Sequence, residues 1–297
     1  MGFVVYNYLN RLTIVIGELY MKAKKLSCLS ILAAALVLTF PSCKKKEASR
    51  IFRTIDEIKA SGELRIAAYS DRPPVSWTDE TWEYHGFYVY FARQLAADLQ
   101  VEPVFFHVKP AELAETIETG VVDVGASFAE IPERSDRVAY TLPYMKTYIA
   151  VMSPVDDLIT SVDELKDKRL IVEAGTVSER YFSIKHPDVT LVKVAIAPQI
   201  FQALRLGRGD AIAATYTSLK DWVAGNPDYE VGIKSVGNPI MIAACVHKDN
   251  SELLQWINED MVELGKRQFF HEDYEATLRK TLGADADPDD QVIEDWK

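Results

Sequence analysis

Cysteine is scarce in this sequence, and its small number excludes a disulfide framework. The 297 residues include three cysteines, too few for the set of bridges that holds small secreted domains together. Histidine is also sparse, and its five copies stand far apart in the chain. Neither residue type shows the ligand spacing of a structural zinc site, so we expect no metal and no cofactor. These residues are Cys28, Cys43, Cys245, His85, His107, His186, His247 and His271.

An excess of positive charge is missing as well. The chain has 33 Lys and Arg against 44 Asp and Glu, a formal net charge of −11. Nucleic acids and anionic membrane surfaces both require concentrated Lys and Arg, so we expect neither as a partner. The sequence also has no Gly-rich phosphate loop and no G-x-S-x-G nucleophile motif. The composition, 48% hydrophobic and 26% charged, is that of an ordinary soluble protein.

The N-terminal segment has the layout of a secretory signal. After Met21, three lysines precede an apolar run of roughly 15 residues, and small residues lead to Cys43. This run is short for a membrane-spanning helix, which needs about 20 residues. Residues 21–42 resemble a bacterial lipoprotein signal peptide, in which Cys43 becomes the lipidated first residue, although Phe40 and Pro41 depart from the usual pattern. An uncleaved anchor is the alternative.

The residues on either side of this signal have simple interpretations. Residues 1–20 precede a complete signal, so we expect them to be an over-extended start, with translation beginning at Met21. Residues 43–50 form a polar tether, which would hold the protein by its lipid on the periplasmic or extracytoplasmic side of the membrane. The remaining chain is long enough for two compact α/β units.

Strand and helix patterns alternate along that remaining chain. Capping boxes predict helix starts at Thr54, Ser161 and Thr176. The two halves repeat the same order of elements, which indicates two lobes, and the acidic end of the chain is expected to be solvated and partly disordered. Expected strands cover residues 64–69, 101–108, 121–126, 169–174, 190–195, 210–214 and 240–248, and expected helices cover 86–99, 110–119, 198–206, 250–266 and 271–282.

Ligands of largely parallel sheets bind beyond the carboxyl ends of the strands, so the segments after strands are the candidates. These segments are "YSDRPPVSW", "SFAEIPER" and "GTVSER". In the last one, Gly175 lets the chain turn out of a strand, and Thr176 caps the next helix. The free first amides of that helix form a site for a carboxylate or a phosphate. An ordinary cap, satisfied by the Thr176 hydroxyl, is the alternative.

Arg134 follows a strand end in the other half of the chain. A guanidinium that faced the helix amides across a cleft would hold one carboxylate from both sides. Such charge-assisted hydrogen bonds contribute roughly 1.5–3 kcal/mol each. An isolated loop arginine is usually solvated, so the position of Arg134 decides between a binding site and a bare loop.

Several motifs, in this order and spacing, resemble one protein family. They include "GELRIAAYSDRPPVSW", "ETGVVDVGASFAEIPERSDRVAYTLPYM", "LKDKRLIVEAGTVSE" and "LRLGRGDAIAA". Together they are similar to the family 3 extracellular solute-binding proteins, the polar amino-acid-binding proteins of bacterial ABC importers, over residues 51 to about 283. The resemblance implies a monomeric binding protein, not an enzyme, that takes a small carboxylate-bearing solute and delivers it to an ABC permease in the membrane.

The resemblance also implies a fold. The expected architecture is α/β, the type II periplasmic-binding-protein fold, with two lobes that each contain a mixed, mostly parallel sheet flanked by helices. Lobe one should comprise residues 51–150 and 243–297, and lobe two residues 151–242. Two hinge crossings should lie near 149–152 and 241–245.

The family's ligand-binding positions carry over to this sequence residue by residue. The arginine of the "I-P-E-R" stretch, Arg134, stands where the family binds the α-carboxylate, and the Thr176 and Val177 amides complete the clamp. Arg137 has no such counterpart and is expected at the surface. The floor of the site would be lined by Ser127, Phe128 and Ala129, and the ligand side chain would be contacted by Tyr69, Asp71, Arg72 and Trp77.

Thr215 departs from the family pattern. Members that bind α-amino acids usually place an aspartate at this position, to pair with the ligand ammonium. A hydroxyl accepts one hydrogen bond but carries no charge, and a desolvated ammonium without an anion is costly. Two possibilities stay open: the ligand lacks an α-amine, or Asp71 or a glutamate elsewhere binds the amine.

Two other functions are compatible with such a fold. The protein could present its ligand-bound form to a receptor instead of a permease. The sequence shows no motif that would recognise one or the other, so it does not separate the two functions. It could also be a dehydratase of prephenate-like acids, which requires a general acid over the carboxylate. Thr215 is a poor acid, which speaks against the dehydratase.

Overall fold

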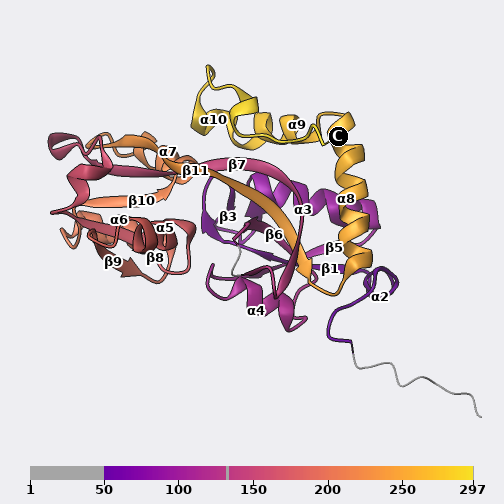
Figure 1. The fold of residues 1–297 in the computed structure, drawn as a ribbon. Coiled ribbons are helices and arrows are strands. Elements are labelled where there is room, and N and C mark those ends of the chain that lie inside the picture. Colours follow the sequence, from indigo (N-terminus) through magenta and orange to yellow (C-terminus); the bar gives the residue numbers. More distant parts are fainter. Residues whose placement is uncertain (1–49, 132–133, 297) are drawn as a thin grey trace, which may run out of the picture. The chain divides into compact units, whose positions relative to one another are not determined.

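Two long antiparallel strands connect the two halves of the protein. The computed structural model describes residues 50–131 and 134–296, and Arg50–Lys297 belong to one compact unit. Within it, β7 (Val138–Pro154) pairs with β11 (Tyr229–His247) along its length. Both strands pass from one lobe to the other (Figure 1). The pairing register shifts at several points between Val231 and Cys245, so the two strands are irregular where they cross.

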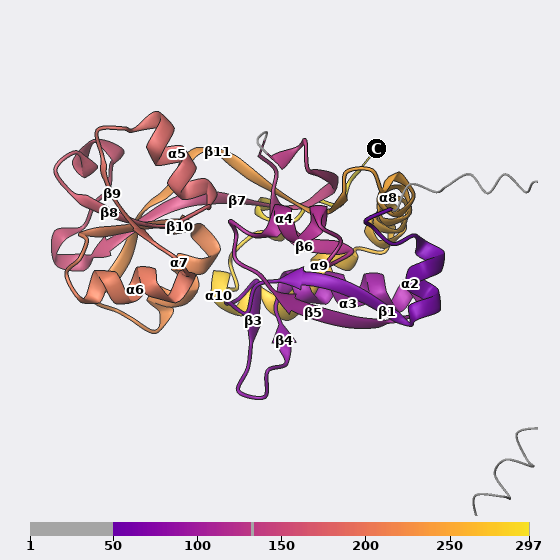
Figure 2. The same ribbon diagram turned by 90° about the horizontal axis from the view of Figure 1, so that it is seen from below.

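The first lobe is built on three parallel strands, β1 (Glu63–Ala68), β5 (Glu102–His107) and β6 (Val124–Ala129). Its helices are α2 (Ile55–Ser61), α3 (Phe87–Leu99) and α4 (Leu113–Glu118). Helix α3 buries Phe87, Phe91, Leu95 and Leu99, which stand four residues apart and so share one face. A small separate sheet projects from this lobe (Figure 2), formed by β2 (Asp71–Arg72), β3 (Ser76–Thr78) and β4 (Tyr84–His85).

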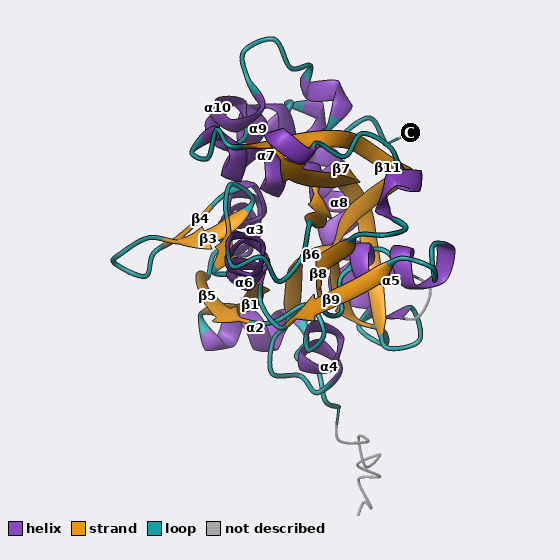
Figure 3. Cartoon of the chain, turned by 90° about the vertical axis from the view of Figure 1, so that its left-hand side faces the viewer, coloured by secondary structure: helices purple, strands orange, loops and turns teal. Residues whose placement is uncertain are grey.

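The second lobe is built on β8 (Arg169–Glu173), β9 (Thr190–Val194) and β10 (Ala211–Thr215). Strand β8 is parallel to both neighbours, and β10 is antiparallel to β7. Figure 3, which views this lobe from its outer end, shows α5 and α6 on opposite sides of β8 and β9. The helices of the second lobe are α5 (Val177–Lys185), α6 (Ala197–Arg205) and α7 (Tyr216–Ala224). This lobe also has 3-10 turns at Val155–Asp157 and Val162–Leu165.

All of these strands except the small sheet join into one eight-stranded sheet, in the order β5-β1-β6-β11-β7-β10-β8-β9. The chain then ends in α8 (Ser251–Lys266), α9 (Phe269–Thr277), α10 (Arg279–Leu282) and a 3-10 turn at Pro288–Asp290. Helix α9 packs on α3 of the first lobe, whereas α10 contacts α7 of the second lobe. There the Thr281 hydroxyl donates a hydrogen bond of 2.9 Å to an Asp221 oxygen.

The expected α/β architecture with two lobes and two crossings is confirmed. The strand expected over 121–126 is shifted, because residues 124–129 pair with β1 on one side and with β11 on the other. The capping box at Thr54 is present, whereas the one at Ser161 begins only a 3-10 turn. The exact lobe boundaries at 150, 151, 242 and 243 stay a prediction.

Most of residues 284–290 are exposed, as expected for the acidic end of the chain, but the residues that follow pack against the first lobe. Val292 is buried and forms a bridge with Met145 of β7. The Trp296 indole donates to the Pro143 carbonyl at 2.8 Å, and Glu294 accepts the Phe270 amide at 3.0 Å. The prediction was wrong for these last residues, because two apolar side chains among the acidic ones, Val292 and Trp296, contact β7.

Across the described residues, no helix is both long and apolar enough to cross a membrane. The predictions for the signal peptide 21–42, the lipidated Cys43, the tether 43–50 and the start at 1–20 lie outside the described residues, except for Arg50.

Candidate functional site

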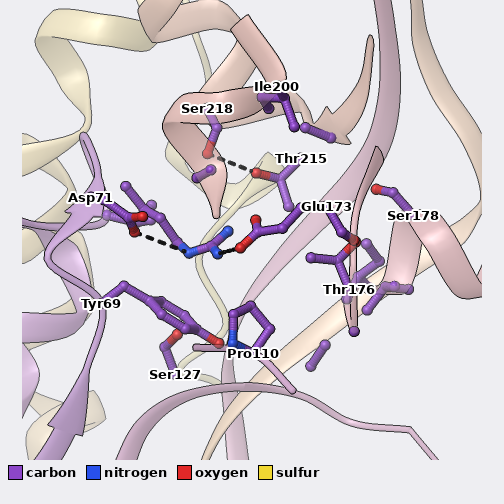
Figure 4. A pocket seen from close by; sticks show the side chains of 18 of the residues that line it. Tyr69, Asp71, Pro110, Ser127, Glu173, Thr176, Ser178, Ile200, Thr215 and Ser218 are labelled. Atoms are coloured by element: carbon purple, nitrogen blue, oxygen red, sulfur yellow. Dashed lines mark hydrogen bonds and ion pairs between the residues drawn. The ribbon is translucent and has the colours of Figure 1, made fainter. Parts of the chain in front are cut away.

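A cavity of about 150 Å³ lies between the two lobes. Figure 4 shows Tyr69, Asp71 and Ser127 of the first lobe facing Glu173, Thr176 and Thr215 of the second lobe. Other lining residues include Arg72, Pro110, Ala129 and Arg134 from the first lobe, and Gly175, Val177, Ser178, Ile200 and Ser218 from the second.

The cavity is where the strands of both lobes end. Tyr69 follows β1, Ala129 ends β6, Glu173 ends β8 and Thr215 ends β10. These are the carboxyl ends of strands that are parallel within each lobe, the ends at which ligands of α/β proteins bind. The same topology therefore places polar side chains from distant parts of the sequence around one small space.

Arg134 is held across the boundary between the lobes. Its Nη2 donates to the Gly175 carbonyl at 3.0 Å and to the Pro110 carbonyl at 3.2 Å. The guanidinium also lies 4.8 Å from the ring centroid of Phe128, a cation–π contact. Arg134 is thus not a solvated loop charge. Arg137, in contrast, is half-exposed and pairs with Glu118.

The N-terminus of α5 faces the same cavity. The Thr176 hydroxyl accepts the Glu179 amide at 3.3 Å and donates to the Glu173 carbonyl at 2.7 Å, while the Gly175 amide donates to Glu179 at 2.7 Å. These bonds hold the turn in place. The next amides, of Val177 and Ser178, belong to the first turn of the helix and have no acceptor within it. Val177 and Ser178 are both lining residues of the cavity, at the positive end of the helix dipole.

Gly175 makes a close approach between the lobes. Its φ is +76°, and a Cβ atom at this position would lie 2.9 Å from the Cβ of Ala111 in the first lobe. Glycine is thus required twice here, for the left-handed backbone and for the contact. This approach brings the α5 turn within reach of Arg134.

Glu173 is the main site residue that our sequence interpretation did not name. Its carboxylate is buried and forms an ion pair with Arg72, with 2.5 Å between Oε1 and Nη2. Burial raises the pKa of Glu173, and the Arg72 charge offsets only part of this rise. A sequence signal existed, because Glu173 is a charged residue directly after the apolar run Leu170–Val172, at the carboxyl end of its strand.

Arg72 has further contacts on its own lobe. Its guanidinium lies 4.3 Å from the ring centroid of Tyr69, and its Nε lies 3.8 Å from an Asp71 oxygen. Desolvation lowers the pKa of Arg72, but the charge and hydrogen bond of Glu173, together with the Asp71 charge, outweigh it, and the net shift is upward. Arg72 therefore stays a cation in the cavity.

Thr215 lies in the cavity wall, where the sequence placed it. Its hydroxyl donates to the Ser218 hydroxyl at 3.0 Å (Figure 4). No carboxylate replaces it at that position, so any anion for an ammonium group must come from elsewhere in the cavity wall.

Two of the candidate residues do not line this cavity. The Phe128 side chain is buried in the first lobe, because successive side chains of a strand point to opposite faces and Ser127 and Ala129 take the cavity face. Phe128 contributes only through its contact with Arg134. Trp77 lies in β3, where its ring contacts His85 at 4.9 Å, and it borders a different depression with Tyr90.

One group of described side chains could hold a metal ion. Asp79, Glu83 and His85 have ligand atoms within 4.8 Å of one another, at the turn between β3 and β4. Asp79 already accepts the His85 ring nitrogen at 2.9 Å and the Thr81 and Glu83 amides, so its oxygens shape the turn. This group lies outside the cavity.

Comparisons with known proteins agree with the geometry. Residues 64–276 match the family of bacterial extracellular solute-binding proteins, family 3, and the chain therefore belongs to that family. The cysteine-binding protein of Campylobacter jejuni superposes with a TM-score of 0.78 at 36% identity, covering 81% of this chain and 98% of that one. The L-cysteine solute receptor of Neisseria gonorrhoeae gives 0.79 at 34% identity, covering 82% and 100%.

A further relative is known by sequence. The arginine-binding protein 1 of an Escherichia coli K12 ABC transporter is 27% identical over 210 residues, which cover 69% of this chain and 86% of that protein. These matches confirm the family resemblance and the periplasmic-binding-protein fold. The family consists of solute-binding proteins, so the chain is a binding protein and not an enzyme.

Proposed function

We propose that this protein captures a small α-amino acid between its lobes and delivers it to the permease of an ABC importer. One observation carries the proposal: the Arg134 guanidinium is held opposite the Gly175–Thr176 turn, with a cavity beside both. A ligand carboxylate there would accept hydrogen bonds from the guanidinium and from the first amides of α5. It would replace the Gly175 carbonyl as the partner of Arg134.

The size of the cavity favours a small ligand. An engineered protein cavity of about 150 Å³ takes up benzene, which has a molecular size close to that of the smaller amino acids. The cavity between these lobes has about this volume. The two solved relatives described above bind cysteine, and the sequence relative in Escherichia coli binds arginine. We propose cysteine, or a neutral amino acid of similar size, as the ligand.

Binding would act by closing the lobes. A ligand that touches both lobes stabilises the closed form over the open one, because only the closed form makes all of its contacts. The permease would read that closed form. We propose that two rigid bodies move on closure. Residues 51–150 and 243–297 form one of them, and residues 151–242 form the other.

The protein would work outside the cytoplasmic membrane, held there by a lipid on Cys43. The support is the signal-like segment before Cys43. The wild-type protein should incorporate a labelled fatty acid and Cys43→Ser should not, because the lipid is attached to the Cys43 thiol. A wild-type protein that stays in the membrane without the label would point to an uncleaved anchor.

The function is tested by a thermal-shift screen of the purified protein with the twenty amino acids, their deaminated analogues and small amines. A ligand at 100 times its dissociation constant should stabilise the protein by about 2.7 kcal/mol. We expect L-cysteine to raise the unfolding midpoint more than arginine does. If no amino acid raises the midpoint, the proposed function is wrong.

A further inference from the structure

The cavity wall contains more charge than a carboxylate clamp requires. Besides Arg134 it includes Arg72, Asp71, Glu173 and Asp221. A bound α-amino acid brings one more cation, its ammonium group, which needs an anion once it is removed from water. One of the three carboxylates in the wall must therefore take that role, because Thr215 carries no charge.

Glu173 is placed best for this role. The ammonium and the carboxylate of an α-amino acid are attached to the same carbon atom, so their binding groups must be neighbours. Glu173 stands two residues before Gly175, whose carbonyl already contacts Arg134 at 3.0 Å. Asp221 instead accepts a hydrogen bond from Thr281, at the contact between α7 and α10.

Burial distinguishes Glu173 from Asp71. The Glu173 side chain is 5% exposed and that of Asp71 is 18% exposed. A buried carboxylate without a cation is costly, and in the described structure Arg72 supplies that cation. The pair spans the cleft, since Arg72 belongs to the first lobe and Glu173 to the second.

Arg72 has other partners if it leaves Glu173. The Asp71 carboxylate lies 3.8 Å from its Nε, and the Tyr69 ring lies 4.3 Å from its guanidinium carbon. Both contacts are within the first lobe, so they do not depend on closure. If a ligand cation replaced Arg72 at Glu173, the Glu173 carboxylate would pair with that cation and the Arg72 guanidinium would keep its contacts with Asp71 and Tyr69.

We propose that Glu173 binds the α-ammonium group of the ligand, and that Arg72 occupies the Glu173 carboxylate when the lobes are closed without ligand. The inference rests on the proposed function and names the ammonium site that Thr215 cannot provide. The ammonium takes the place of the guanidinium, so the Glu173 carboxylate has a cation in the closed form with and without ligand. The exchange makes the site selective for ligands that carry both charges, because a carboxylate alone leaves Arg72 in place.

The test compares L-cysteine with 3-sulfanylpropanoate, which is the same molecule without its ammonium group. Calorimetry at pH 7 with a reductant is applied to the wild type, E173Q, R72Q and the double variant R72Q/E173Q. We expect the wild type to prefer L-cysteine by about ten- to a hundred-fold. E173Q and the double variant should lose this preference. R72Q should keep the preference and bind L-cysteine more tightly, since the competing cation is gone.

The double variant protects the test against misfolding. E173Q alone leaves Arg72 without its strongest partner and could fail to fold, whereas the double variant removes both charges of that pair and leaves only Asp71, which is 18% exposed, without Arg72. A double variant that still prefers L-cysteine overturns the role of Glu173. An unchanged L-cysteine affinity in R72Q overturns the exchange.

Failure of the proposed function would show in the wild type instead. If the wild type binds a different amino acid, the comparison uses that compound and its deaminated analogue. If the wild type binds no amino acid, the proposed function and this inference fall together, without reference to any variant.

Discussion

A guanidinium nitrogen of Arg134 lies 3.0 Å from the carbonyl oxygen of Gly175, a residue 41 positions later in the chain and on the other lobe. The guanidinium is supported from its own lobe by the Phe128 ring and by the Pro110 carbonyl. The side chain is thereby preorganised, so a ligand carboxylate meets a cation whose position needs little adjustment.

Substitution Arg134→Ala should abolish ligand binding and leave the unliganded protein folded. Two lost charge-assisted bonds amount to about 3 kcal/mol or more, which lowers affinity at least a hundred-fold. Calorimetry measures this loss, and the thermal midpoint without ligand should change little. Arg137→Ala is the matched control, because Arg137 pairs with Glu118 and does not line the cavity. Undiminished affinity in the Arg134 variant would remove this residue from the site.

Substitution Gly175→Ala should weaken closure. Both the positive φ and the contact with Ala111 oppose a Cβ atom at this position, and the contact lies between the lobes. Gly207→Ala is a strict control, since Gly207 has a φ of +63° but no atom within 4 Å of the added Cβ. Each variant should lose about 1–2 kcal/mol of stability from backbone strain.

Only Gly175→Ala should also lose ligand affinity. Its radius of gyration at saturating ligand, measured by small-angle X-ray scattering, should stay above that of the wild type. Equal ligand affinities in the two variants would mean that the Gly175–Ala111 approach does not matter for closure.

Asp260 should make the stability depend on pH. Burial, followed by repulsion from Asp98, raises the pKa of Asp260 to about 7 in the folded protein, against 3.8 for an ordinary aspartate. Between these values the folded state keeps a proton that the unfolded state has released. This contribution to stability is therefore fully present below pH 4 and is lost as the pH rises to about 7.

Asp260→Asn should remove this dependence and stabilise the protein at pH 8, as measured by urea unfolding at several pH values. Asp98→Asn should remove only part of it, because desolvation is the larger cause. Parallel pH profiles for the wild type and the Asp260 variant would contradict the assignment.

The C-terminal segment should add a second pH dependence through His271. Burial lowers the pKa of His271, but hydrogen bonds and charges from Glu294 and Asp289 outweigh it, and the net shift is upward. A histidine with a raised folded pKa stabilises the protein below its unfolded pKa of about 6.5, and this stabilisation is lost as the pH rises through the folded value.

Glu294→Gln should thus destabilise the protein more at pH 5.5 than at pH 9. Asp289→Asn should have a smaller effect, because the Asp289 side chain is 78% exposed whereas that of Glu294 is 6% exposed. Chemical denaturation at the two pH values measures both. A loss of stability in Glu294→Gln that is the same at both pH values would mean that His271 titration is not involved.

Local patterns predicted most of the elements, because caps, glycines and apolar periodicity act over a few residues. Thr54 and Thr176 cap helices as expected, and α3 buries the face that its spacing indicates. The prediction failed where a distant segment decides the outcome. Residues 127–129 form a strand because β11 lies beside them, and Val292 is buried because β7 offers it a place.

The sequence by itself determined the family and the two-lobed architecture, and it predicted the carboxylate half of the candidate site. Arg134 and the Gly175–Thr176 turn each stand in a short motif with a local physical meaning, and each follows the carboxyl end of a strand, where α/β proteins bind their ligands. Only the tertiary structure decided that Glu173 and Arg72, 101 positions apart, meet in the cavity and that Phe128 turns away from it. The reason is physical: packing between distant segments sets which partner a buried charge meets, and no local sequence pattern specifies which segments pack together.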